Sequence, residues 1–183
     1  MRVTIAGSIA LLGIVTVFSY IPTRGKSHGL GSDIAHGRPA GKGAESPAAA
    51  DSVEERVLRH NHLGVARLEQ YDYRRAVEEF QKAANLRPDY LPAIVNLGIA
   101  LYYDSNYPNA IEQFRATLKI DPLEPHAHFM LGLIHTKESR NREALEEFER
   151  VLATHPEDSA ANYNVGLIFM RSRDYEQAIR CFE

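Results

Sequence analysis

The chain has 183 residues, 44% of them hydrophobic and 25% charged, which excludes a wholly disordered chain and a polytopic membrane protein. Its single cysteine, Cys181, excludes an internal disulfide framework and a cysteine-rich zinc module. A formal net charge of -3 argues against a general nucleic-acid binder, so we expect no nucleic-acid partner. The charge is also uneven, because residues 1–50 hold five Lys and Arg against two acids whereas the rest of the chain is net acidic.

The amino-terminal segment contains 21 consecutive residues without a formal charge, at positions 3–23. A helix of that length spans about 30 Å, the thickness of the hydrocarbon core of a bilayer. We therefore predict a transmembrane anchor or signal peptide over residues 1–23. A retained anchor is favoured over a cleaved signal, because basic residues interrupt the candidate cleavage sites. The expected location is membrane-anchored with the rest of the chain outside the cytoplasm, periplasmic or lumenal; the alternative is secretion after cleavage.

A segment rich in small residues follows. Residues 22–50 contain six glycines and three prolines and almost no large apolar side chain. Such a composition cannot bury enough surface to offset its ordering entropy. We predict a flexible linker over residues 24–50 that holds a folded domain, residues 51–183, away from the bilayer.

The folded domain repeats every 34 residues. Four glycines mark the period: Gly64, Gly98, Gly132 and Gly166. An alanine stands twelve residues after each glycine: Ala76, Ala110, Ala144 and Ala178. A phenylalanine stands four residues later: Phe80, Phe114, Phe148 and Phe182. Prolines close the first three units: Pro88, Pro122 and Pro156. This register predicts helix hairpins that stack into a solenoid.

The residue types explain how the hairpins form. We expect Gly and Ala to face each other where two antiparallel helices approach closely, and Phe to fill the space between one pair and the next. Capping residues between Gly and Ala mark the turn within each unit, and the closing proline prevents the second helix from continuing. A capping box, Ser52 with Glu55, opens the first helix.

These residues resemble the tetratricopeptide repeat (TPR) family from about residue 57 to the end of the chain. The resemblance implies an all-α fold, a right-handed solenoid of antiparallel helix pairs. The repeats are expected at about 57–90, 91–124, 125–158 and 159–183, the last one truncated. The chain departs from the family where Trp and Tyr are favoured, four before and three after each Gly.

The first helix of each pair is expected to line a concave groove. Its exposed face includes the residues three before, one after and four after each Gly. The predicted peptide-contacting residues at these positions are Val95, Ile99, Tyr102, Phe129, Leu133 and Tyr163. Such an aliphatic and aromatic surface favours an extended or helical peptide with apolar side chains.

Two further kinds of side chain are candidates for peptide contact. Asn96 and Asn164, two before their glycines, match an asparagine ladder that holds a peptide main chain in TPR proteins related to O-linked N-acetylglucosamine transferase. A solvated polar residue is the alternative for both. Lys137 and Arg171, five after their glycines, are expected to add a modest preference for anions. The carboxylate clamp known in other TPR proteins is not expected, because only Asn96 of its positions agrees.

Catalytic and metal chemistry is not expected. The closest histidines, His60 with His62 and His126 with His128, are two residues apart and diverge on a helix. Cys181 lacks a partnering base. We therefore expect no cofactor and no metal.

The sequence as a whole favours a membrane-tethered scaffold or adaptor that binds a protein or peptide partner. The alternative is the substrate-recruiting portion of a longer enzyme, such as a glycosyltransferase. A second copy of the chain, bound through the uncapped carboxyl-terminal end, is a further candidate partner.

Overall fold

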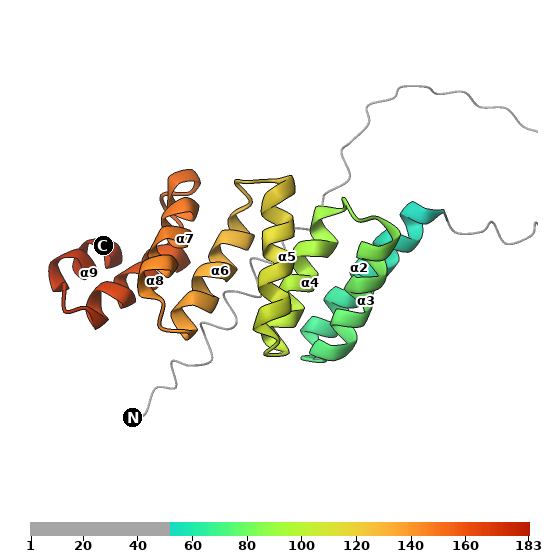
Figure 1. Cartoon of the computed structure of the whole chain (residues 1–183), viewed down its shortest axis with the longest axis horizontal. Helices are drawn as coiled ribbons and strands as arrows, with labels where there is room; N and C mark the ends of the chain where they lie inside the picture. Colours follow the sequence, from blue (N-terminus) through green and yellow to red (C-terminus); the bar gives the residue numbers. More distant parts are fainter. Residues whose placement is uncertain (1–51) are drawn as a thin grey trace, which may run out of the picture.

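The computed structural model describes residues 52–183, which form eight α-helices in four antiparallel pairs, with no strand in this range. Figure 1 shows the pairs in a single row along the long axis, α2 and α3 at one end and α9 at the other. The helices are α2 (Val53–Glu69), α3 (Tyr73–Leu86), α4 (Leu91–Tyr103), α5 (Tyr107–Ile120), α6 (Pro125–Lys137), α7 (Asn141–Thr154), α8 (Ser159–Arg171) and α9 (Tyr175–Phe182).

This architecture confirms the all-α solenoid of helix pairs. The predicted membrane segment at residues 1–23 and the linker at residues 24–50 lie outside the described residues. Among the helices of residues 52–183, none combines the length and hydropathy needed to cross a bilayer.

The turns within the four pairs share one geometry. In the turn from α6 to α7, Ser139 N–H bonds the Thr136 carbonyl and Arg140 N–H bonds the His135 carbonyl, at 3.1 and 2.9 Å. These two hydrogen bonds close the end of the first helix as a Schellman motif. The motif requires a left-handed residue, and all four turns use a residue other than glycine there: Tyr71, Ser105, Ser139 and Arg173, with φ between 59° and 65°.

Each repeat glycine lies against the phenylalanine of its own helix pair. A Cβ atom on Gly132 would come within 2.7 Å of Phe148 Cε1, and the other three glycines face their phenylalanines in the same way. Phe80 also shares a buried cluster with Val95 and Leu97 of the second pair, in line with the expectation that Phe fills the space between neighbouring pairs. The glycine is needed because the ring occupies the place of its side chain.

Most helix starts follow the expected signals, but Asn106, also expected to cap a helix, lies at the N-cap of α5 without a side-chain hydrogen bond there. Ser52 Oγ accepts from Glu55 N–H while the Glu55 carboxylate accepts from Ser52 N–H, which confirms the capping box. Asp72 and Asp174 cap α3 and α9 through their side chains. The closing prolines lie in the turns between pairs, just after α3, α5 and α7 end.

The core consists of separate buried apolar clusters that bridge neighbouring repeats. One buried apolar cluster joins the first three repeats and a second joins the last two. Phe80, Phe114 and Phe148 are fully buried in these clusters. The equivalent phenylalanine on the last helix, Phe182, is 46% exposed.

Candidate protein-binding surface

The predicted contact residues on α4 lie mostly in the interior. Val95 and Ile99 are each only 2% exposed and belong to the cluster that joins the first three repeats. Tyr102, one turn further along α4, is half-buried. The first two therefore offer almost no surface to a partner.

The equivalent residues on α6 and α8 are progressively more open. Phe129 and Leu133 on α6 are half-buried, and the Phe129 ring lies edge-on to the Phe148 ring at 5.6 Å between centroids. On α8, Tyr163 is 37% exposed and Met170 is 47% exposed. Among the predicted contact positions, the exposed apolar residues thus lie on α8 and the half-buried ones on α6.

The two candidate ladder asparagines are in different surroundings. Asn96 is 4% exposed and donates through Nδ2 to Oδ1 of the buried Asn61, at 3.1 Å. Within the described residues, Oδ1 of Asn96 is buried without a hydrogen-bond partner. Asn164 is half-buried and donates to the Ala160 carbonyl of its own helix at 2.7 Å. Both amides therefore use a donor within the fold, and peptide binding through them stays a prediction.

The two candidate cations lie at the ends of α6 and α8. Lys137 Nζ lies 5.7 Å from the centroid of the Tyr102 ring and 6.0 Å from that of Tyr107, so its charge interacts with two aromatic faces. Burial raises the pKa of the Tyr102 hydroxyl, and the neighbouring Tyr103 and Tyr107 add to this effect. Arg171 is exposed in the last turn of α8.

Sequence reasoning missed an aromatic cluster at the turns of the first two repeats. Tyr73 and Tyr103 stack with centroids 5.4 Å apart, and Tyr103 also meets Tyr102 edge-on at 5.2 Å. Tyr71 and Tyr107 extend this cluster at its two ends. The 34-residue spacing of Tyr73 and Tyr107 was the available signal, since it places both at the start of a second helix.

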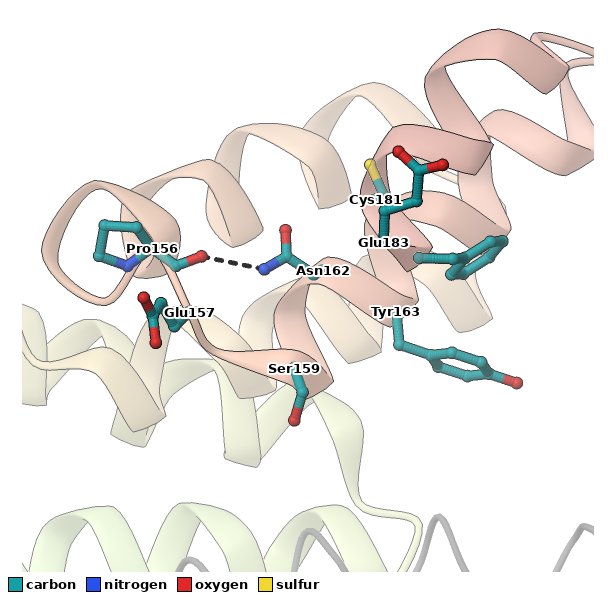
Figure 2. A pocket seen from close by; sticks show the side chains of 8 residues that line it. Pro156, Glu157, Ser159, Asn162, Tyr163, Cys181 and Glu183 are labelled. Carbon is teal, nitrogen blue, oxygen red and sulfur yellow. Dashed lines mark hydrogen bonds between the residues drawn. The ribbon is translucent and has the colours of Figure 1, made fainter.

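A pocket at the carboxyl-terminal end was also missed. Its volume is about 540 Å³, and Figure 2 shows the side chains that line it, from the turn before α8, from α8 itself and from the end of α9. Asn162 Nδ2 donates to the Pro156 carbonyl across it at 3.0 Å. Burial raises the pKa of the Cys181 thiol at its edge, although Arg180 opposes this effect. A raised pKa disfavours the thiolate that nucleophilic chemistry requires.

The last helix exposes an apolar face. Tyr175, Ile179 and Phe182 are 60%, 57% and 46% exposed. This face is the end through which self-association was expected, and self-association stays a prediction.

Three of the described histidines, His60, His126 and His128, lie beside a carboxylate. His60 Nδ1 lies 2.7 Å from Glu79 Oε2, and His128 Nδ1 lies 2.6 Å from Glu147 Oε2. Across residues 52–183, no group of three or more His, Cys, Asp or Glu side chains is arranged to hold a metal ion.

Comparison with a family model gives these repeats a name. Residues 95–140 and 137–183 each match the model described as tetratricopeptide repeat. Residues 95–183 therefore match tetratricopeptide repeats. The first helix pair, α2 with α3, lies outside the matched residues and has the same contact between glycine and phenylalanine as the other pairs.

Solved structures share the same fold. A crystal structure of MamA matches with a TM-score of 0.63 at 21% identity, covering 69% of this chain and 74% of that one. MamA from Desulfovibrio magneticus RS-1, residues 41 to the end, matches with a TM-score of 0.63 at 25% identity, covering 70% and 73%. PilF of Pseudomonas aeruginosa matches with a TM-score of 0.63 at 22% identity, covering 71% and 60%. No curated protein matches the chain significantly.

Tetratricopeptide repeats build extended surfaces that suit protein binding. The repeats therefore point to an interaction scaffold.

Proposed function

We propose that this protein is a membrane-tethered adaptor that binds a peptide segment of another protein on the surface formed by α6 and α8. The single observation that carries this proposal is the exposure of Tyr163 and Met170 on a first helix, where the equivalent α4 residues, Val95 and Tyr102, are buried and half-buried. Apolar and aromatic side chains exposed in a row along a solenoid are suited to the apolar side chains of a bound segment.

Membrane tethering is the second element of the proposal. It is supported by the uncharged run at residues 3–23 and by the small-residue composition of the linker that follows. In this arrangement the repeats lie outside the cytoplasm, and the linker lets them reach a partner at some distance from the bilayer.

The binding surface has a defined polar border. Asn164 and Arg171 lie on the same helix as Tyr163 and Met170, and Lys137 ends the neighbouring α6. Asn164 keeps its carbonyl oxygen available while its amide nitrogen bonds Ala160. This oxygen accepts a main-chain N–H of the bound segment, and the two cations favour an acidic residue beside its apolar anchors.

Affinity capture with the full chain tests the proposed surface. We expect the double variant Tyr163→Ala with Met170→Ala to retain at least about tenfold less partner than the parent chain, because hot-spot aromatic residues dominate such interfaces. The matched control is Tyr175→Ala, which removes an exposed aromatic side chain from α9, outside the proposed surface. The readout is the amount of each retained protein, with helicity followed by circular dichroism. Equal retention by the double variant and the parent chain, at unchanged helicity, would rule out this surface.

A further inference from the structure

The ring of His128, on α6, bonds two acceptors at once. Nδ1 lies 2.6 Å from Glu147 Oε2 on α7, and Nε2 lies 3.0 Å from the carbonyl oxygen of Pro122 in the turn between α5 and α6. The side chain is 5% exposed, so water does not supply alternative partners freely. His128 therefore connects three parts of the stack: the turn that ends the second repeat and both helices of the third.

The two bonds determine the protonation of this pair. A carbonyl oxygen only accepts, and a neutral imidazole carries a single N–H. Both contacts are satisfied together only if the pair holds one extra proton. Because an imidazole is more basic than a carboxylate, that proton resides on the ring, and His128 is an imidazolium paired with ionised Glu147.

The neighbouring charges act in opposite directions. Burial lowers the pKa of His128, but the hydrogen bonds to Glu147 and to the Pro122 carbonyl outweigh it, so that the net shift is upward. Arg150, also on α7, opposes the charged form. At the start of α6, Glu124 is 1% exposed and accepts from His126 Nδ1 and from Ala127 N–H, at 2.7 and 2.6 Å.

The other charged group of this junction lies in the turn itself. Asp121, at the end of α5, accepts from Leu123 N–H at 3.0 Å. Its carboxylate is therefore used within the turn. Glu147 is therefore the carboxylate that pairs with protonated His128.

The other repeats show what is particular to the third. In the fourth repeat the equivalent residue is Asn162, which donates to the Pro156 carbonyl at 3.0 Å, the same bond to the turn (Figure 2). An amide makes this bond without titrating. The residue equivalent to Glu147 there is Cys181, so the fourth repeat keeps the bond to the turn and lacks the ion pair.

The first repeat keeps the ion pair and lacks the bond to the turn. His60 Nδ1 bonds Glu79 Oε2 at 2.7 Å, and Lys82 Nζ bonds the other oxygen of the same carboxylate at 2.6 Å. The residue equivalent to Pro122 is Glu54, which lies inside α2. In the second repeat Ile94 takes the histidine position. Only the third repeat, among those described, combines both bonds on one ring.

We propose that protonated His128 is a pH-sensitive clamp that fixes the third repeat to the turn before it, and that the junction of α5 and α6 loosens when the ring loses its proton. The proton is bound more tightly in the folded than in the unfolded chain. The contribution of His128 to the free energy of unfolding is therefore complete below the ordinary histidine pKa of about 6.5. It is lost as the pH rises through the higher pKa of the folded state. Phe129, which borders the proposed binding surface, follows His128 on α6. The clamp nevertheless acts in the free chain, whether or not the proposed surface binds a partner.

Thermal unfolding of the full chain between pH 5.5 and 9 tests the clamp. The test variant is His128→Asn, which keeps the bond to the turn as Asn162 does and removes the titrating group. We expect the difference in Tm between the parent chain and this variant to shrink by about 3 °C or more from pH 6 to pH 9. The matched control, His60→Asn, removes a histidine–glutamate contact that lacks the bond to a turn. A pH-dependent difference in Tm for this control as large as that for His128→Asn would count against a clamp that needs both bonds. A His128→Asn difference that is independent of pH would overturn the proposal.

The protonation itself is measured in the parent chain, which requires no variant. Nitrogen NMR of the imidazole rings distinguishes a ring with two N–H groups from a neutral one. We expect His128 to show two N–H groups above the ordinary histidine pKa of about 6.5. A His128 ring that has lost its proton at or below that pH would contradict the clamp.

Discussion

The helices α4 and α8 hold equivalent places in their repeats and are covered very differently. Val95 on α4 is 2% exposed, whereas Tyr163, at the same distance from its glycine on α8, is 37% exposed. The helix α4 packs against α2, α3, α5 and α6, while α8 packs mainly against α7 and α9. Position within the repeat thus sets the direction of a side chain, and the neighbouring repeats decide whether it is covered.

The largest expected effect comes from enlarging a glycine in an interior repeat. In Gly132→Leu, the new side chain must occupy the space of Phe148, which is fully buried and cannot move aside. We expect a loss of about 3 kcal/mol or more in the free energy of unfolding, measured by urea denaturation.

The matched variant Gly166→Leu sharpens the comparison. Here the opposing ring, Phe182, is 46% exposed and can rotate into solvent. The expected loss is below about 1 kcal/mol, since leucine is also a better helix former than glycine. Equal losses for the two glycines would show that coverage by neighbouring repeats does not control the packing.

A smaller, stabilising effect is expected in the turns. Ser139 adopts φ of 61°, a conformation that costs an L-residue about 1 kcal/mol and glycine almost nothing. We expect Ser139→Gly to raise the free energy of unfolding by about 0.5 kcal/mol. Relief of the backbone strain stabilises the fold, and the greater entropy of glycine in the unfolded chain offsets part of that gain.

Two controls accompany the turn substitution. Ser139→Ala keeps the Cβ atom and should not stabilise the chain. Arg173→Gly, at φ of 65° in the last repeat, should give a gain similar to that of Ser139→Gly, because backbone strain is local. A gain in one turn only would mean that the strain depends on the neighbouring repeats as well.

The sequence predicted those parts of the fold that are determined within one repeat. The glycine period, the capping residues and the closing prolines act on the nearest helix or turn, and the helix pairs and the caps at Ser52, Asp72 and Asp174 follow from them. The contact between the phenylalanine ring and the glycine of its own pair was not foreseen, because spacing alone does not say which helix the ring meets.

The features that depend on several repeats could not be predicted in this way. Val95 and Ile99 are covered because repeats lie on both sides of α4. The bond between Asn61 and Asn96 joins positions that are not equivalent in their repeats, three and two residues before a glycine, so the period gives no hint of it. The two bonds of His128 likewise combine residues from the turn, α6 and α7.

Hydrogen exchange along the full chain, measured at one pH, tests most directly whether neighbouring repeats decide how firmly each helix is held. The amides of α4 should exchange at least about a hundredfold more slowly than those of α9, since local opening is easiest where few buried contacts must break. Equal protection of α4 and α9 would contradict this account.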